Sequence, residues 1–251
     1  MEQSGSSTDM PIEPFQGRGA NLITVQPAVA TVRSRGETAV ETPLLSAPMG
    51  RALKRAMDIV GSASALIVLS PLLIVLMIAL TVETGGHPIF VQQRIGRSGS
   101  LFKIFKFRTM SRDSDDRLVS SLERDEELAH EWATLRKLRN DPRVTRAGRL
   151  LRKYSLDELP QFANVLLGQM SLVGPRPIVE EESLLFGHHL PAVLSMRPGL
   201  TGLWGVSGRN ELGYEERVLL EQRYVHGWTL GLDLSILLRT IPRVIKGSGA
   251  F

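Results

Sequence analysis

The stretch Ile59-Val-Gly-Ser-Ala-Ser-Ala-Leu-Ile-Val-Leu-Ser-Pro-Leu-Leu-Ile-Val-Leu-Met-Ile-Ala-Leu-Thr-Val82 contains no charged residue. Its 24 residues are long enough, as a helix, to cross a bilayer core about 30 Å thick. Ser70-Pro71 lies in the middle, where proline removes a helical hydrogen bond and clashes with the preceding turn. The stretch therefore predicts either a kinked spanning helix or two half-helices that enter and leave the membrane on one side.

The charges that flank this stretch favour the second arrangement. Arg51, Lys54 and Arg55 precede it, and no acidic residue lies between Thr84 and Ser111 in the basic segment that follows. Basic residues concentrate on the cytoplasmic side of membranes, so both flanks are expected there. We predict a membrane-embedded, re-entrant helix-break-helix over residues 51–85. A buried hairpin in a soluble core is the alternative, and the length of the apolar run argues against it.

The rest of the chain divides into a tail and a larger domain. Residues 1–50 are rich in Gly, Ser, Thr, Pro and Gln without steady periodicity, which predicts a disordered N-terminal tail and no signal peptide. Residues 86–251 are expected to form a domain on the cytoplasmic side. With no cysteine in the chain, disulfides, thiolate zinc sites and cysteine nucleophiles are excluded.

Local patterns in this domain predict an α+β fold, mostly helical with a small β-hairpin. Residues 88–91 and 101–107 read as strands, with Gly96 and Gly99 in the turn between them. Residues 196–202 read as a turn-rich connector. Helices are expected over 112–139, 144–153, 155–168, 213–226 and 232–246. The last helix suits either the membrane interface or packing on the core.

Asp157 and Glu158 are the first candidates for chemistry. They sit in Ser155-Leu-Asp-Glu-Leu-Pro-Gln161, at the start of a predicted helix. A purely structural explanation exists, because Ser155 and Glu158 fit a helix-capping box. The basic residues nearby favour function, since carboxylates next to guanidinium groups suit a site that holds and attacks a phosphate. Asp157 or Glu158 would also suit Mg²⁺, which takes carboxylate and phosphate oxygens.

Basic residues supply candidate phosphate ligands. Eight of them lie between Arg136 and Lys153 against one acid, and Arg146, Arg149 and Lys153 form a helical stripe beside Arg152. Arg176 is held between two prolines, Lys106 lies near the end of the second predicted strand, and Arg108 directly follows that strand. A solvated basic face is the alternative. The net charge of +4 favours anionic partners, but no nucleic-acid recognition motif, P-loop or His-Glu-x-x-His motif is present.

Several motifs follow one another in a specific order and spacing. These are Ser70-Pro71, Phe105-Lys106-Phe107-Arg108-Thr109-Met110, Leu156-Asp157-Glu158-Leu159-Pro160-Gln161, Val173-Gly174-Pro175-Arg176-Pro177, Arg197-Pro198-Gly199-Leu200-Thr201-Gly202, and Trp228 with Asp233. On these motifs the chain, from Arg51 to its C-terminus, resembles the bacterial sugar transferases, the monotopic polyprenyl-phosphate phosphoglycosyl transferases. Residues 137–145 and 202–210 look most like the branch that initiates rhizobial-type exopolysaccharide, the galactosyl- and glucosyl-phosphate transferases.

The resemblance implies an enzyme that transfers a sugar-1-phosphate, galactose or glucose, from a UDP-sugar to polyprenyl (undecaprenyl) phosphate and releases UMP. It implies a catalytic domain on the cytoplasmic side of the bacterial inner membrane, where the donor and the lipid acceptor meet. Other exopolysaccharide assembly proteins or a second copy of the chain are further expected partners, and nucleic acid is not.

The resemblance also implies residue roles. Asp157 would be the nucleophile that forms an aspartyl-phosphosugar intermediate and a ligand of Mg²⁺, with Glu158 supporting both. Arg152 and Arg176 would clamp phosphate, and Lys106 and Arg108 would face donor or lipid phosphate. The family usually has an acid where this chain has Gln169. That departure supports an alternative, a non-catalytic membrane-anchored scaffold for polysaccharide assembly.

Overall fold

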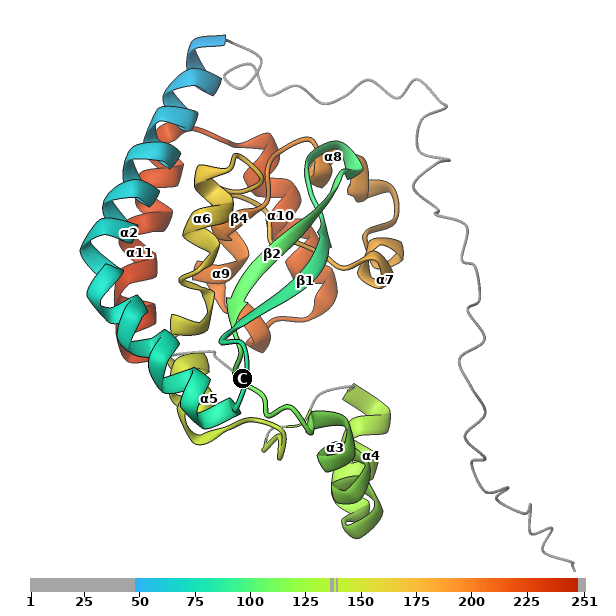
Figure 1. Cartoon of the computed structure of the whole chain (residues 1–251). Coiled ribbons are helices and arrows are strands. Elements are labelled where there is room, and N and C mark those ends of the chain that lie inside the picture. The colour runs from blue at the N-terminus through green and yellow to red at the C-terminus, as the bar shows by residue number, and fades with distance from the viewer. Residues whose placement is uncertain (1–47, 136–137, 139, 248–251) are drawn as a thin grey trace, which may run out of the picture. The chain divides into compact units, whose positions relative to one another are not determined.

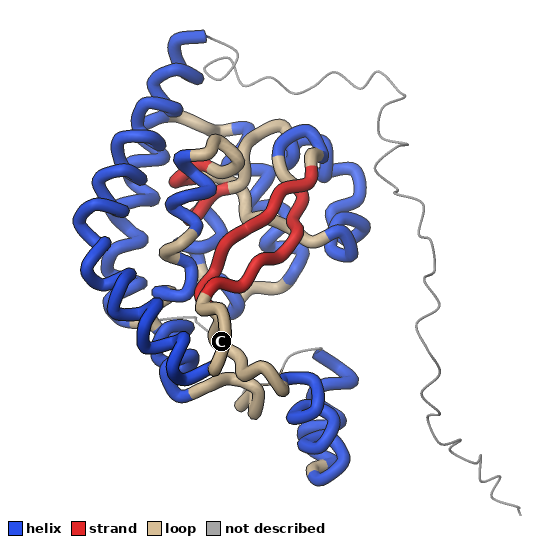
Figure 2. The backbone as a smooth tube through the Cα atoms, in the orientation of Figure 1, coloured by secondary structure: helices blue, strands red, loops and turns tan. Residues whose placement is uncertain are grey.

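The computed structural model describes residues 48–135, 138 and 140–247, so nearly all of the predicted tail lies outside it. Figure 1 shows a helical domain with a long β-hairpin, and Figure 2 separates its helices from its strands. The elements are α2 (Pro48–Thr84), β1 (Ile89–Ile95), β2 (Leu101–Phe107), α3 (Ser114–Arg124), α4 (Glu126–Leu135), α5 (Arg146–Lys153), α6 (Gln161–Leu166), β3 (Ser171–Val173), α7 (Glu180–Ser183), α8 (Leu190–Leu194), β4 (Gly199–Thr201), α9 (Leu203–Ser207), α10 (Tyr214–His226) and α11 (Leu230–Lys246).

The apolar segment forms one helix, α2, so the prediction that Ser70-Pro71 divides it into two half-helices is wrong. The helix runs through Pro71, although Figure 1 shows it changing direction near its middle. Proline deprives the carbonyl of Ile67, four residues earlier, of its usual donor. The hydroxyl of Ser70 donates to that carbonyl instead, at 2.8 Å. This substitute hydrogen bond lets the helix continue through the bend, because it satisfies the group that proline orphans.

Both ends of α2 are bonded to the same domain. Near the start, the guanidinium of Arg55 donates to the carbonyls of Val165 (2.6 Å) and Leu166 (2.8 Å). Near the end, the carboxylate of Glu83 accepts from the hydroxyl of Thr145 and the amide of Ala147, both at 3.2 Å. The helix is long and apolar enough to cross a membrane, and only 6% of its most apolar 18-residue window is buried. The outer face of α2 is therefore an exposed apolar surface, and both ends of the helix are hydrogen bonded to the same folded domain.

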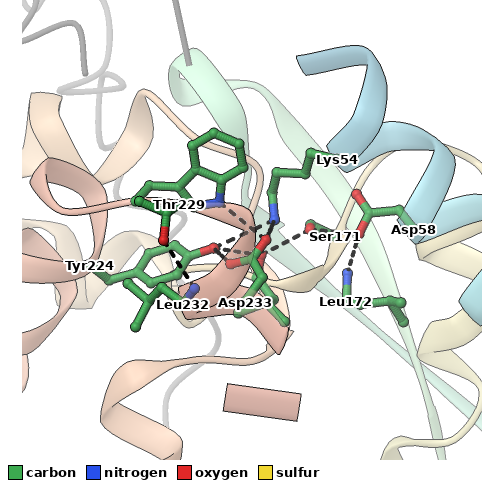
Figure 3. A network of polar contacts seen from close by, with 10 residues as sticks. Lys54, Asp58, Ser171, Leu172, Tyr224, Thr229, Leu232 and Asp233 are labelled. Atoms are coloured by element: carbon green, nitrogen blue, oxygen red, sulfur yellow. Dashed lines mark hydrogen bonds and ion pairs between the residues drawn. The ribbon is translucent and has the colours of Figure 1, made fainter. Parts of the chain in front are cut away.

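A buried ion pair joins α2 to α11 (Figure 3). The ammonium of Lys54 lies 2.6 Å from the carboxylate of Asp233, which has no exposed surface. Tyr224 donates to the same carboxylate at 2.7 Å, and the indole N–H of Trp228 donates at 3.1 Å. Lys54 also donates to the carbonyl of Val173 at 2.9 Å, and the hydroxyl oxygen of Tyr224 lies 3.1 Å from the same carbonyl oxygen. This network ties the apolar helix to the end of β3.

The predicted hairpin and helices are confirmed with small shifts. β1 and β2 pair antiparallel, from Ile89 opposite Phe107 to Ile95 opposite Leu101. Residues 112–139, predicted to form one or two helices, contain α3 and α4, whereas the helix predicted over 155–168 is a 3₁₀ turn, Leu156–Glu158, followed by α6. Residues 196–202 are not simply a connector, because β4 pairs in parallel with β3. The main core cluster packs between these elements around Val173, Tyr224 and Ile236.

Candidate active site

The acidic pair lies on the 3₁₀ turn between α5 and α6. Ser155, just before the turn, adopts a left-handed conformation (φ 54°, ψ 24°) and makes no capping bond, so the predicted capping box is absent. Its hydroxyl accepts instead from the guanidinium of Arg209 at 3.2 Å. A left-handed serine is a strained arrangement of the kind that collects at functional sites. The structure thus removes the helix-capping explanation for Asp157 and Glu158.

The two carboxylates have opposite electrostatic environments. Burial, together with the charge of Glu158, raises the pKa of Asp157 from 3.8 to about 6. Burial also opposes ionisation of Glu158, but Lys106, Arg176 and Arg209 together outweigh it and lower its pKa. The ammonium of Lys106 lies 3.2 Å from a Glu158 carboxylate oxygen. Glu158 is therefore a fixed anion in an ion pair, whereas Asp157 is a carboxylate whose charge is poorly compensated.

Arg176 is positioned by a loop, residues 174–177, in which both backbone N–H groups are hydrogen bonded. The Gly174 amide donates to the carbonyl of Thr201 at 2.9 Å, and the Arg176 amide donates to the carboxylate of Glu221 at 3.1 Å. Gly174 is required here, because a Cβ would lie 2.5 Å from the carbonyl oxygen of Arg197. The Arg176 guanidinium stacks over the Trp204 ring, 5.1 Å from its centre.

These side chains meet in a polar cavity of about 420 Å³. Every site residue predicted from the sequence lines it: Lys106, Arg108, Arg152, Asp157, Glu158 and Arg176. These residues belong to β2, the loop after it, α5, the 3₁₀ turn and the loop after β3. Arg152 is fixed by a 2.9 Å hydrogen bond from its Nε to the hydroxyl of Thr109, another lining residue.

The predicted basic wall is only partly correct. Of the stripe on α5, Arg152 reaches the cavity, whereas Arg146, Arg149 and Lys153 are not in its lining. Arg149 instead donates to the carbonyl of Val144. Arg136, Lys137 and Arg139 lie outside the described residues.

Arg209 is the site residue that the sequence analysis missed. It lines the cavity, bonds Ser155 and, like Ser155, has a left-handed backbone (φ 53°). Burial lowers its pKa, against the opposing effect of the Glu158 carboxylate. The run Gly208-Arg209-Asn210 was the available signal, because glycine and asparagine mark irregular backbone.

Gln169 lies outside the polar cavity that contains the acidic pair. Its amide oxygen accepts from the Asn164 side chain at 2.7 Å, and Asn164 also bonds the β2 backbone at Lys103 and Phe105. Gln169 does not line the cavity that contains Asp157. An amide here completes a hydrogen-bond network that holds α6 against β2, so the main argument for the scaffold alternative loses its force.

The residues present suit a magnesium ion held partly by substrate. Within residues 48–135, 138 and 140–247, no three acidic or histidine side chains gather into a metal cluster. Mg²⁺ is commonly held by one or two carboxylates together with substrate phosphates. Asp157 offers a carboxylate inside a cavity lined by guanidinium and ammonium side chains, and Glu158 is engaged by Lys106.

A carboxylate with a raised pKa, in a cavity lined by several guanidinium groups, suits chemistry on a phosphate ester or anhydride. The chain belongs to the bacterial sugar transferase family, whose sequence model matches residues 49–247. It is 44% identical to the exopolysaccharide production protein ExoY of Rhizobium meliloti, over 81% of this chain and 90% of that one. It is 48% identical to the undecaprenyl-phosphate galactose phosphotransferase of Salmonella typhimurium, over 80% of this chain but 42% of that protein.

A third relative carries a different sugar in its name. The UDP-glucose:undecaprenyl-phosphate glucose-1-phosphate transferase of Caulobacter vibrioides is 38% identical over 79% of this chain and 72% of its own length. Family membership makes the chain a sugar transferase.

Proposed function

We propose that this protein transfers a hexose-1-phosphate from a UDP-sugar to polyprenyl phosphate, releases UMP, and so begins the synthesis of an exopolysaccharide. The observation that carries the proposal is the placement of Asp157, with its raised pKa, in one cavity with Arg152, Arg176 and Lys106. The names of the relatives supply the donor and acceptor classes, and they include both galactose and glucose transferases. The sugar is therefore galactose or glucose.

The reaction divides into two displacements at one phosphorus atom. A carboxylate oxygen of Asp157 attacks the sugar-bearing phosphorus, the bond from that phosphorus to the UMP oxygen breaks, and UMP leaves with the electron pair. A phosphate oxygen of the lipid then attacks the same phosphorus and releases Asp157. The first displacement leaves an acyl phosphate on Asp157, which is reactive enough for the second displacement. The lipid phosphate needs no general base, because it is already ionised. At pH 7 Asp157 is mostly ionised, as a nucleophile must be.

The remaining side chains offset the negative charge of the phosphates and of Glu158. Arg152 and Arg176 present planar donor forks that suit phosphate oxygens, and Lys106 holds Glu158 beside the nucleophile. Asp157 would hold Mg²⁺ together with substrate phosphates. The ion would neutralise charge that develops on the phosphate oxygens.

The same proposal places the protein on the cytoplasmic face of the bacterial inner membrane. Arg55 and Glu83, near opposite ends of α2, bind the same domain, which suits a helix that dips into one leaflet and returns. The exposed Leu234, Leu238 and Ile241 on α11 would add an interfacial surface. The basic flanks of α2 agree with this side.

The test is UMP release from purified protein in phospholipid nanodiscs with undecaprenyl phosphate and Mg²⁺, given UDP-galactose, UDP-glucose or a UDP-N-acetylhexosamine. We expect lipid-dependent release with one of the two hexoses and none with Asp157→Asn. A folded, membrane-bound protein that releases no UMP from any donor would contradict the proposal and favour the scaffold alternative.

A further inference from the structure

A second cavity of about 470 Å³ lies beside the polar one, with walls from α2, β4 and α11. Its lining is largely apolar and includes Leu69 from α2, Leu200 from β4, and Leu237 and Ile241 from α11. We call this cavity the apolar groove. None of the steps attributed to the polar cavity requires an aliphatic lining of this size.

The apolar groove ends at charged residues of the active site. The two cavities share Lys106, Glu158, Arg176 and Arg209, whereas Asp157 and Arg152 line only the polar cavity. Three of the four shared charged residues are cations. The groove therefore suits a ligand with a long apolar tail and an anionic head, because the tail would meet aliphatic walls and the head would meet ammonium and guanidinium groups.

The groove lies next to the surfaces that would face lipid. Ile241 lines it and is 57% exposed, and its neighbour Leu238 is 62% exposed. On α2, Val68 is 75% exposed beside the lining residue Leu69. A lipid chain that enters between α2 and α11 would stay in contact with apolar side chains, so the transfer would avoid the cost of exposing it to water.

We infer that the apolar groove binds the isoprenoid tail of the acceptor and presents its phosphate at the wall shared by the two cavities. The inference rests on the proposed function and adds where the acceptor binds. The nucleotide sugar occupies the polar cavity, so donor and acceptor approach the phosphorus from different openings. The first displacement then needs only the polar cavity, whereas the second needs both.

Substitutions that block the apolar groove should impair the second displacement, to the lipid acceptor, without impairing the first. Ile241→Trp narrows the groove at a site exposed enough to accept the larger ring, and Leu69→Trp does so from the opposite wall. Leu219→Trp is the matched control, because it adds the same ring at an equally exposed position on α10, outside both cavities. The first displacement is measured alone as exchange of radiolabelled UMP into the UDP-sugar without lipid. The complete reaction is measured with undecaprenyl phosphate in nanodiscs.

We expect Ile241→Trp and Leu69→Trp to raise the KM for undecaprenyl phosphate about tenfold or more and to leave UMP exchange within about twofold. Leu219→Trp should change neither value by more than about twofold. An unchanged KM in both groove variants, or a parallel loss of exchange and transfer, would overturn the inference. Wild-type protein that shows neither exchange nor transfer would refute the proposed function itself, which distinguishes the two failures.

Discussion

Asp157→Asn should stabilise the protein while it abolishes activity. The pKa of Asp157 rises from 3.8 in the unfolded chain to about 6 in the fold, so the folded state holds this proton more tightly. Stability is therefore lost as pH rises from about 4 through 6. At about 1.36 kcal/mol per unit, the shift corresponds to about 3 kcal/mol above pH 7. Because the side chain keeps some solvent contact, we expect asparagine to recover about 2 to 3 kcal/mol.

The measurement is thermal unfolding with EDTA present, at pH 7.5 and pH 4. At pH 7.5 the variant should melt about 4 to 12 °C above wild type, given 2–4 °C per kcal/mol for a domain of this size. Most of the difference should disappear at pH 4, where the wild-type carboxyl group is protonated in the folded state. An equal or lower Tm for the variant at pH 7.5 would refute the assigned environment of Asp157.

Glu158→Gln is the matched control and should shift Tm in the opposite direction. The pKa of Glu158 is lowered because Lys106, Arg176 and Arg209 outweigh its burial, so its ionised form stabilises the fold above its unfolded pKa. That contribution is lost as pH falls. Glutamine should therefore lower Tm at pH 7.5 and have less effect in acid. If both substitutions shift Tm in the same direction, the two carboxylates do not have opposite environments.

Four further outcomes are expected. The UMP exchange rate should rise with pH and level off above about 6, since the nucleophile Asp157 must be ionised; a flat profile from pH 5 to 8 would contradict this. Lys54→Met should cost about 3 to 5 kcal/mol in denaturant unfolding, because it leaves the Asp233 carboxylate buried without its cation. Arg176→Lys should lower kcat/KM about tenfold or more through loss of the planar fork and its stacking on a ring, and wild-type kinetics would exclude that role. Ser70→Ala should cost about 1 kcal/mol in thermal unfolding, because the Ile67 carbonyl loses its substitute donor.

Elements with strong local signals were predictable. Two strand-like runs on either side of Gly96 and Gly99 predicted the β1–β2 hairpin, and the gap between the helices predicted over 112–139 and 144–153 separated α5 from the helices before it. β3 and β4 were not predictable, since each has three residues and its only partner lies far away along the chain. The effect of Pro71 was misjudged, because the rescue of the helix depends on where the Ser70 hydroxyl points.

Some residues of the candidate site were likewise predictable from local sequence, and others were not. The acidic pair, Arg152 and Arg176 were recognisable from residue type, spacing and family resemblance. Arg209 gave only the weak signal of a glycine before it, and its role depends on the left-handed turn that brings it to Ser155. Gln169 was misread as a possible loss at the active site, because sequence alone does not show which way the end of α6 faces.

By itself, the sequence determined the apolar helix, the order of most elements and the candidate reacting groups, because charge, periodicity and residue chemistry are local properties. The tertiary structure alone decided that Asp157 is poorly compensated while Glu158 is paired, and that an apolar groove ends at the same cations as the polar cavity. Burial and cavity shape arise where segments distant in sequence converge. No single segment carries that information.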